Sequence, residues 1–309
     1  MKLVGMNNIP KEFYIPPKTE VIFVQDFFAK ELVGGAELTS DAIIKACPKK
    51  LFELHAHSIT ETLIKKNKDK LWVFGNQTMV PPYLLQMFID LNVTYVFFEY
   101  DFKPCVMRSI KKHALQAGSC ECHKQTHGKF MAKWITHAKL NFWCSDGQRE
   151  QFERLYPEFK DKTKNFTQSS TFYPETILNI RKVRERKERG QLVPEDRWAI
   201  LDSDSWIKGT EDAVKYCKEN NMNYVLLKNL TNEQFLEELA KSKGLVFFPR
   251  DMDVGSRITV EAKLLGCEVI LNDHVLPKFE PWFSSPLNEI ETYFLDGPSR
   301  FWRVIQETL

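Results

Sequence analysis

Short apolar runs alternate with amphipathic stretches along this chain, and that alternation limits the fold more than any other feature of the sequence. Residues 21–25 (VIFVQ) predict a buried strand, and residues 36–47 predict the helix that follows it. The same order recurs, with strands expected at 51–55, 71–74, 94–100 and 140–144, a helix opened by a capping box at 58–61, and helices at 82–90, 129–137 and 146–156. Strands that alternate with helices predict βαβ crossovers and a parallel sheet covered on both faces.

A second series of the same kind occupies the rest of the chain. It comprises expected strands at 198–201, 224–227, 245–248 and 268–271, helices at 210–220, 231–241 and 257–265, and a mostly helical end at 287–309. Between the two series, residues 157–195 hold few apolar side chains, three prolines and a basic run at 181–189. We interpret this segment as a linker or a solvated helix, with a patch for membrane surfaces or acidic ligands as the alternative.

The two series together define the expected fold class. We expect an α/β protein of two Rossmann-like, doubly wound domains, residues 1–175 and 176–309, which face each other across a cleft. In folds of this kind, ligands bind at the carboxyl ends of the strands, and the space between two domains is a natural binding site.

Charge and cysteine content exclude several classes of protein. The 309 residues include 43 Lys and Arg against 41 Asp and Glu, a net charge of +2, so no global field favours nucleic acid. No apolar run approaches about 18 residues, the length of a membrane-spanning helix. Residues 1–17 lack the apolar region of a secretory signal, and seven cysteines at low density are typical of a reduced compartment. We expect a cytoplasmic protein with no nucleic-acid partner and no integral membrane segment.

Two glycines, Gly34 and Gly35, stand between the first expected strand and the first expected helix. Glycine permits a close approach of the backbone, and the free N–H groups of a helix N-terminus favour an anion. The segment lacks both the GxGxxG pattern of dinucleotide-binding proteins and the GK[ST] of a P-loop. Taken alone, the pair of glycines favours a tight turn of structural role, with a loop that binds a ligand as the alternative.

A second glycine loop precedes the helix expected at 257–265. Gly255 and the N–H groups of Ser256 and Arg257 predict a phosphate cradle, to which the Arg257 guanidinium adds a bidentate donor. Asp253 and Glu261 flank this loop, and two carboxylates so close together suit the recognition of sugar or ribose diols. The alternative is an N-capped helix with a glutamate on its surface.

A third segment, Lys208–Gly209, follows the first strand of the second series. A lysine at such a turn is suited to a diphosphate, and the glycine lets the chain turn sharply. In this order, the three segments resemble those of GT-B fold glycosyltransferases, particularly the retaining, nucleotide-sugar-dependent enzymes of family 4. The motifs that carry the resemblance are 34–37 (GGAE), Lys208–Gly209 and the acid pair at 253 and 261.

The resemblance assigns roles to these residues. It implies that Lys208 neutralises the diphosphate of the donor, that Glu261 holds the ribose hydroxyls and that Asp253 contacts the donor sugar. It also implies transfer with retention at the anomeric carbon. We further expect the terminal helix to pack back toward the first domain.

Two features depart from the family pattern. The first acid is Asp253 rather than glutamate, which shortens its reach by one methylene group, and residues 202–207 contain no arginine ahead of Lys208. Arg257 and Arg250 are the candidates to supply the missing positive charge.

The strand end at residues 99–102 carries the candidate for the acceptor side. Asp101 lies where an open α/β sheet places its ligand contacts, and we expect its carboxylate to face the cleft, with Asn76 beside it as a polar partner. The alternative is an acid that caps a loop.

Three cysteines and one histidine lie in the irregular stretch after Asp101: Cys105, His113, Cys120 and Cys122. These are the ligand types of a zinc site with three thiolates and one imidazole, and a closed tetrahedral shell would order a loop, residues 103–128, that is too long and polar to order itself. The alternatives are free thiols and a redox pair. We expect zinc in a structural role only and no catalytic metal, because GT-B enzymes stabilise the leaving group with side chains and helix dipoles.

The leading hypothesis is transfer of a sugar from a nucleotide-diphosphate sugar to a hydroxyl acceptor, whether a glycan, a lipid-linked molecule or a small molecule. Lys208, Arg257 and the two glycine loops would oppose the charge that builds on the departing diphosphate. The first alternative is a sugar-nucleotide epimerase of the same fold, with Asp101 and His57 as acid and base. The second is a non-catalytic protein that binds a nucleotide sugar or a partner.

Overall fold

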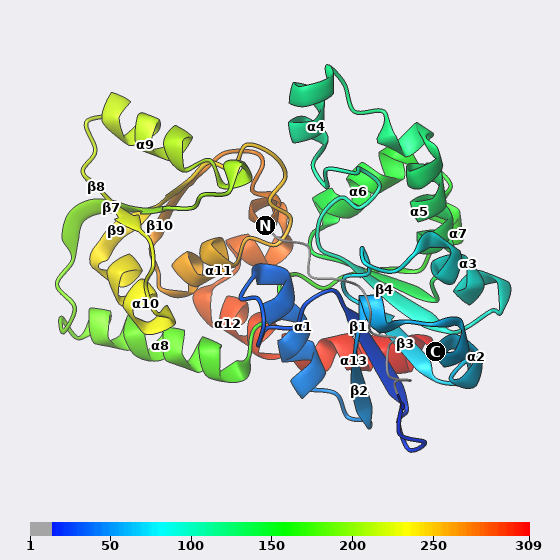
Figure 1. The fold of residues 1–309 in the computed structure, drawn as a ribbon. Coiled ribbons are helices and arrows are strands. Elements are labelled where there is room, and N and C mark those ends of the chain that lie inside the picture. The colour runs from blue at the N-terminus through cyan, green and yellow to red at the C-terminus, as the bar shows by residue number, and fades with distance from the viewer. Residues whose placement is uncertain (1–13) are drawn as a thin grey trace, which may run out of the picture.

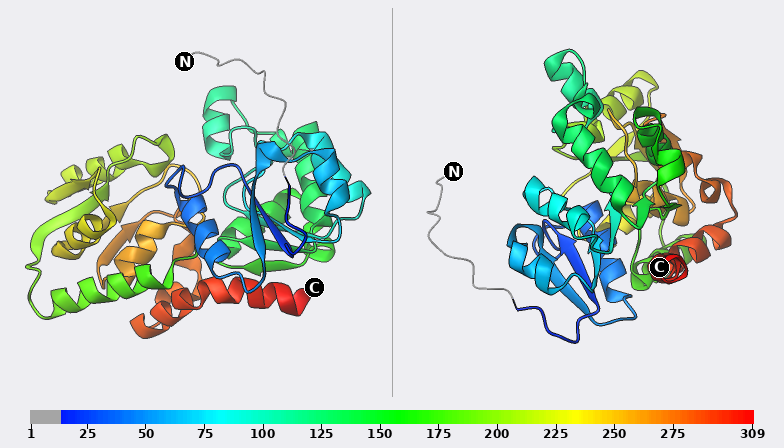
Figure 2. Two further views of the ribbon diagram at one scale, coloured as in Figure 1. Left: turned by 60° about the horizontal axis from the view of Figure 1, so that its bottom comes forward. Right: turned by 90° about the vertical axis from the view of Figure 1, so that its right-hand side faces the viewer.

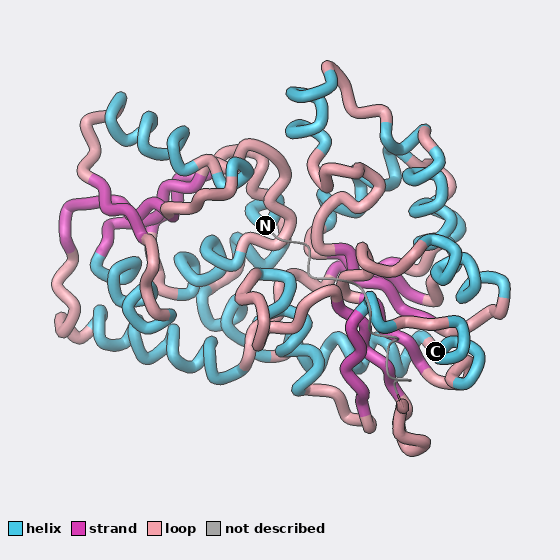
Figure 3. Tube along the Cα trace, viewed as in Figure 1, coloured by secondary structure: helices cyan, strands magenta, loops and turns pink. Residues whose placement is uncertain are grey.

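The computed structural model describes residues 14–309, which form two parallel β-sheets, each flanked by helices (Figure 1; Figure 3). The expected fold class, two doubly wound α/β domains facing each other, is confirmed. The expectation that the chain carries no secretory signal rests mainly on residues 1–13, which lie outside the described residues.

The first sheet has six parallel strands in the order β2-β1-β3-β4-β5-β6. The strands are β1 (Val21–Gln25), β2 (Leu51–His55), β3 (Leu71–Phe74), β4 (Tyr95–Glu99), β5 (Leu140–Trp143) and β6 (Asn165–Thr167). The principal helices are α1 (Gly35–Lys45), α2 (Glu61–Lys66), α3 (Pro82–Asp90), α4 (Ile110–Ala117), α5 (Thr126–His137) and α6 (Asp146–Leu155). The five strands expected in this half are all present, and β6 is a sixth that the sequence did not predict.

Strand β1 explains why these strands read as unbroken apolar runs. Ile22 and Val24 pack into one core, with Trp72 of β3, while Val21 and Phe23 pack into a second core on the opposite face of the sheet. Because helices cover both faces, successive side chains are all buried, and no polar alternation arises.

The predicted start of α2 was wrong by two residues. Ser58 ends a short 3-10 turn, Ala56–Ser58, and Thr60 is the N-cap, with its Oγ1 accepting a hydrogen bond from the Leu63 N–H at 3.2 Å. Both residues have a hydroxyl that can cap a helix, so the sequence pattern alone did not distinguish them.

The second sheet has four parallel strands in the order β10-β9-β7-β8. The strands are β7 (Glu195–Leu201), β8 (Tyr224–Leu227), β9 (Ser242–Phe247) and β10 (Glu268–Leu271). The helices are α8 (Pro174–Glu188), α9 (Thr210–Glu219), α10 (Asn232–Lys241), α11 (Arg257–Leu264) and α12 (Leu287–Leu295). In this order β8 and β9 lie on opposite sides of β7, so the loops after β7 and β9 border a topological switch point, where doubly wound sheets bind ligands.

The segment 157–195 is more structured than a linker. It contributes a short helix α7 (Phe159–Lys162), strand β6 and the whole of helix α8, which packs its apolar side chains into the core of the second domain. The basic run lies on α8, where Arg181 and Arg184 form ion pairs with Glu291 and Arg186 pairs with Glu237. Much of its charge is therefore satisfied inside the domain, which weakens the alternative of a membrane-binding patch.

Helix α13 (Gly297–Thr308) connects the two domains at the end of the chain (Figure 2). Phe301, Trp302 and Ile305 pack into the same core as Val21 and Phe23 of β1. The Trp302 Nε1–H also donates a hydrogen bond to the Ile43 carbonyl of α1 at 2.8 Å. The boundary predicted at residue 175 stays a prediction.

Among residues 14–309, no helix is both long enough and apolar enough to span a bilayer. All seven cysteines are free thiols in this structure. The cytoplasmic location expected from the cysteine content stays a prediction.

Candidate functional site

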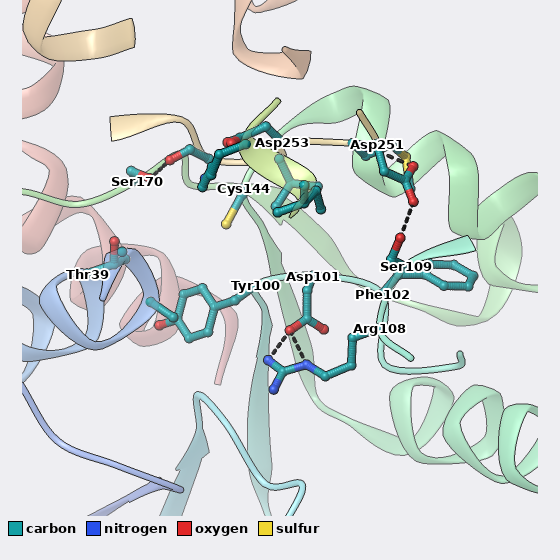
Figure 4. Close-up of a pocket in the computed structure, with 17 residues that line it drawn as sticks. Thr39, Tyr100, Asp101, Phe102, Arg108, Ser109, Cys144, Ser170, Asp251 and Asp253 are labelled. Atoms are coloured by element: carbon teal, nitrogen blue, oxygen red, sulfur yellow. Dashed lines mark hydrogen bonds and ion pairs between the residues drawn. The ribbon is translucent and has the colours of Figure 1, made fainter. Parts of the chain in front are cut away.

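A pocket of about 230 Å³ lies where the carboxyl ends of strands from both sheets face each other (Figure 4). The first domain contributes residues that follow β1, β4, β5 and β6, and the second domain contributes residues that follow β7 and β9. The lining residues are Gly35, Ala36, Thr39, Tyr100, Asp101, Phe102, Arg108, Ser109, Cys144, Ser170, Ile207, Lys208, Asp251, Met252, Asp253, Val254 and Gly255. The pocket thus occupies the position at which this architecture binds ligands.

The wall from the second domain holds a lysine and an aspartate at the switch point. Lys208 Nζ lies 2.6 Å from Asp253 Oδ2, and the Asp253 side chain is only 6% exposed. Backbone bonds fix Asp253, because its N–H donates to the His274 carbonyl at 2.8 Å and its own carbonyl accepts from the Leu276 N–H at 3.1 Å. The cation expected at the diphosphate is therefore paired with the acid expected at the sugar.

Gly209 places Lys208 at this turn. Its φ of 63° is a left-handed conformation, and a Cβ atom there would lie 1.9 Å from the Phe248 carbonyl oxygen. Only glycine fits both conditions, so the sharp turn predicted from the Lys-Gly pair has a physical cause.

Two helix N-termini, one from each domain, reach the pocket. Helix α1 begins at Gly35 after Gly34, and helix α11 begins at Arg257 after Ser256; neither N-cap residue caps its helix with a side chain. The Ser256 hydroxyl instead pairs with the Thr259 hydroxyl at 2.7 Å. The positive end of the α11 dipole therefore lies beside the pocket, whereas that of α1 is shared with the Glu37 carboxylate, which is in the first turn of α1 and lies against Gly34.

Glu261 lies one turn along α11, and the residue is only 8% exposed. Burial raises its pKa from the usual 4.5 to about 7, against the opposing effect of the Arg257 charge. Within residues 14–309, no hydrogen bond to the Glu261 carboxylate is found. Glu261 is not among the residues that line the pocket. A nearly buried acid without a partner is suited to accept hydrogen bonds from ligand hydroxyls.

The two arginines proposed to replace the missing family arginine are both engaged elsewhere. Arg250 pairs with Glu211 and Asp212 of α9. Arg257 donates to the Thr171 carbonyl at 2.6 Å, and its guanidinium lies 3.8 Å from the centre of the Phe172 ring. Neither lines the pocket in this structure, so the role of Arg257 as a phosphate donor stays a prediction.

Arg108 is the cation that sequence reasoning missed. It lines the pocket from the first domain, and its guanidinium pairs with the Asp101 carboxylate (Figure 4). Its φ of 55° is left-handed, a conformation that non-glycine residues adopt mainly where surrounding structure enforces it. The only signal in the sequence was its place in the irregular stretch after Asp101.

Asp101 faces the pocket above a buried ion pair. Lys103 Nζ lies 2.8 Å from the buried Glu99 carboxylate and 3.8 Å from Asp101. Burial would raise the pKa of Asp101, but the Lys103 and Arg108 charges outweigh it and hold that pKa below its usual value. Asp101 is therefore ionised at neutral pH, and its Oδ1 accepts no hydrogen bond from any described residue.

Two other residues considered from the sequence lie outside the pocket lining. Asn76 is buried, and its N–H donates to the Gln25 side chain at 2.6 Å. His57 stacks on His55, with ring centres 5.3 Å apart. The structure therefore does not bring His57 and Asp101 together as an acid–base pair at the pocket.

The four residues of the Cys/His set do converge, away from the pocket. Their ligand atoms, Cys105 Sγ, His113 Nδ1, Cys120 Sγ and Cys122 Sγ, all lie within 4.8 Å of one another. No other comparable metal-binding group occurs in the described part of the chain.

Comparisons with known proteins agree on the fold. No protein-family model and no curated protein matches the chain by sequence. Among solved structures, Anabaena Alr3699/HepE in complex with UDP and glucose superposes with a TM-score of 0.55 at 11% identity, covering 94% of this chain and 95% of that one. WaaG, a glycosyltransferase involved in lipopolysaccharide biosynthesis, superposes with a TM-score of 0.50 at 13% identity, covering 90% of each chain. The chain therefore has the GT-B fold.

Proposed function

We propose that this protein transfers a sugar from a nucleoside-diphosphate sugar to a hydroxyl acceptor. The observation that carries the proposal is the convergence of two uncapped helix N-termini, one from each domain, with Lys208 on a single pocket. The pocket lining also carries three carboxylates, Asp101, Asp251 and Asp253, so a diphosphate would be bound by the local N–H and ammonium donors rather than by an overall positive field. HepE, the structural neighbour described above, was solved in complex with UDP and with UDP-glucose, which makes uridine diphosphates the first donors to test.

The second domain would hold the donor. The bond between the anomeric carbon and the diphosphate breaks with its electron pair on the departing phosphate, and Lys208 with the N-terminus of α11 stabilises that charge. Positive groups of this kind are most effective when water is excluded from the site. The loss of one such contact costs about 2.7–4 kcal/mol of transition-state stabilisation. Glu261 would accept hydrogen bonds from the ribose hydroxyls, and Asp253 would contact the sugar.

Lys208 has to serve both the donor and Asp253. Because its ammonium group already lies against Asp253, a diphosphate bound at the α11 N-terminus would share that cation rather than recruit a free one. Asp253 then keeps Lys208 directed into the pocket before the donor binds. Carrying the ammonium group on a rigid turn reduces the entropy lost on binding.

The first domain would hold the acceptor. The ionised Asp101 would accept a hydrogen bond from a hydroxyl of the acceptor through Oδ2, the oxygen that Arg108 contacts, because its Oδ1 is buried 3.8 Å from Lys103 Nζ. The acceptor oxygen forms the new bond to the anomeric carbon, and its proton passes to the departing diphosphate. Retention at that carbon belongs to the proposal through the family resemblance.

An assay of turnover with a panel of donors tests this function. The purified chain is incubated with UDP-, GDP-, ADP- and CMP-linked sugars, with and without pools of glycan, lipid-linked and small-molecule hydroxyl acceptors, and release of free nucleotide is measured. We expect release from one donor class that rises when an acceptor is added. Conversion of the donor to its epimer without an acceptor would instead support the epimerase, and donor binding without any turnover would support the non-catalytic alternative.

A matched pair of variants shows whether turnover comes from this pocket. Lys208→Ala should lower it by about 100- to 1,000-fold, whereas Lys215→Ala should retain it, because Lys215 is an exposed lysine of α9 that pairs only with Glu219 at the surface. Equal activity in the two variants would contradict the assignment.

A further inference from the structure

The segment between β4 and α5 has few apolar anchors: Phe102 is buried in the core, and Met107 and Ile110 pack against it. Helix α4 has no buried residue, and even its leucine, Leu115, is 70% exposed. Figure 1 shows α4 at the outer edge of the first domain, away from the sheet. Long irregular segments with little core of their own need another source of order. The segment between β4 and α5 needs such order because it carries Arg108, which lines the pocket.

Three of the six distances within the Cys/His set are close to those of a bound zinc ion, and all six are within 4.8 Å. Cys120 Sγ lies 3.6 Å from Cys105 Sγ, and His113 Nδ1 lies 3.5 Å from Cys105 Sγ and 3.2 Å from Cys122 Sγ. Tetrahedral coordination with Zn–S bonds of about 2.3 Å and Zn–N bonds of about 2.0–2.1 Å separates two sulfurs by about 3.8 Å and a sulfur from a nitrogen by about 3.5 Å. The four atoms therefore already surround a position of the right size.

The backbone is shaped to bring the four ligands together. Gly128, near the start of α5, allows the backbone of Cys122 to pack closely against this helix, since a Cβ atom at residue 128 would lie 2.2 Å from the Cys122 carbonyl oxygen. Cys105 and Cys122 are buried, and His113 and Cys120 are half-buried, so water is largely kept from the centre. Three thiolates and one imidazole fill a tetrahedral shell and leave no position for substrate, which is the arrangement of a structural rather than a catalytic zinc.

The same segment is joined to both sides of the pocket. The Arg108 N–H donates to the Cys105 carbonyl at 2.8 Å, so the left-handed turn that presents Arg108 begins at a candidate ligand. Ser109 donates its hydroxyl to Asp251 Oδ2 at 2.5 Å, and the Lys111 N–H donates to the same oxygen at 2.9 Å (Figure 4). Asp251 belongs to the second domain, so order in this segment reaches across the cleft.

We propose that Cys105, His113, Cys120 and Cys122 bind one Zn²⁺ ion, and that this ion holds Arg108 and Ser109 in place at the pocket. Thiolate and imidazole ligands in a tetrahedral set favour Zn²⁺ over Mg²⁺ or Ca²⁺. The metal site stands on the cluster alone, while its effect on catalysis rests on the proposed glycosyl transfer. Zinc acts here as a positioning element and takes no part in the chemical step.

Metal content tests the site independently of any activity. Protein purified without added chelator is analysed by mass spectrometry of the elements, and we expect one zinc per chain in the wild type. His113→Ala and Cys122→Ser should lose it. His113→Cys should keep it in a shell of four thiolates, and Cys47→Ser should keep it because Cys47 lies on the chain outside the cluster. Wild-type protein that stays metal-free when zinc is added, or equal zinc in all these variants, would overturn the proposal.

Hydrogen exchange tests the positioning role, even where a ligand variant folds poorly. Zinc is removed from the wild-type protein with a chelator and then restored, with Co²⁺ in a parallel sample to record the absorption of a tetrahedral thiolate site. We expect exchange at residues 105–125 to rise on removal and to recover on restoration, while exchange in β7 and β9 stays unchanged. Unchanged exchange at 105–125 in the metal-free protein would overturn the positioning role, whatever the outcome of the transfer assay.

Discussion

The two walls of the pocket are built in different ways. The second-domain wall consists of turns from a strand into a helix, with Lys208–Gly209 between β7 and α9 and Asp253–Ser256 between β9 and α11. The first-domain wall depends in part on the long segment from Asp101 to α5, which contains a Cys/His cluster beside its few apolar core contacts. The difference suggests a donor site fixed by the fold and an acceptor side fixed by local chemistry, and substitutions in the two walls should therefore affect different steps.

Lys208→Ala should have the largest effect on catalysis. Removal of the cation from the diphosphate is expected to lower kcat by about 100- to 1,000-fold, the loss associated with one preorganised electrostatic donor. Steady-state kinetics with a saturating acceptor measure this loss. The variant also leaves the nearly buried Asp253 without its partner, so a lower melting temperature is expected as well.

The double variant Lys208→Ala/Asp253→Asn separates these two effects. Neutralising residue 253 should restore the melting temperature without restoring turnover. Recovery of turnover together with stability would show that Lys208 acts only through folding, and the second-domain wall would then lose its assigned role.

Gly209→Ala should be the most destabilising substitution in the same wall. The left-handed backbone and the contact with the Phe248 carbonyl together should cost about 2–3 kcal/mol of the free energy of unfolding. Gly266→Ala is the matched control, because Gly266 has a φ of 65° and open space around its Cβ position. Denaturant unfolding should show a smaller loss there, about 1–2 kcal/mol, and equal losses would exclude the close contact as the cause.

Glu261→Gln should stabilise the protein while it weakens donor binding. Burial raises the folded-state pKa of Glu261 to about 7, so the fold favours the protonated carboxyl over the ionised carboxylate. The stability that the protonated carboxyl contributes is complete below about pH 4.5 and is lost as pH rises from about 4.5 to about 7. At pH 8 the variant should gain roughly 1–3 kcal/mol, and the gain should vanish below pH 4.5. Thermal melts across this pH range test it, with the exposed Glu219→Gln as the control. A gain independent of pH would contradict the assignment of the burial penalty to this carboxylate.

Arg108→Ala should have a smaller effect, confined to the other wall. Loss of the guanidinium frees the Asp101 carboxylate to rotate, and we expect KM for the acceptor to rise about tenfold, equivalent to about 1.4 kcal/mol, with donor affinity unchanged. Arg154→Ala, on the exposed side of α6, serves as the control. A matching fall in donor affinity would show that Arg108 contacts the diphosphate, and the division between the two walls would then fail.

The same contrast explains how much of the molecule could be predicted from the sequence. Strands β1, β2, β3, β8 and β10 have the predicted bounds. In β1 and β3 the cause is burial, which makes a parallel strand a continuous apolar run, whereas β2, β8 and β10 are edge strands that are only partly buried. Gly35, Asp101, Lys208, Asp253 and Gly255 reach the pocket, because the ends of parallel strands meet at one edge of a sheet. Strand β6 escaped prediction since its three residues are only half-buried and carry one aromatic side chain.

Side-chain pairing could not be predicted in the same way. Arg108 reaches the pocket through a left-handed turn in an irregular segment, and no periodic pattern marks such a residue. Arg250 and Arg257 stand close to the motif in sequence, yet acidic side chains of α9 hold the first, and the Thr171 carbonyl and Phe172 ring hold the second. These choices depend on neighbours from distant parts of the chain.

Thermal unfolding of the wild-type protein with a panel of nucleotides is the most direct test of the central claim, that this pocket binds a nucleoside diphosphate. The panel contains three diphosphates (UDP, GDP and ADP), their matching monophosphates, CMP, and the common sugar conjugates of these nucleotides. One diphosphate and its sugar conjugate should raise the melting temperature above the matching monophosphate, since a ligand at 100 times its Kd adds about 2.7 kcal/mol, or several degrees. No shift with any diphosphate or sugar conjugate would contradict the account.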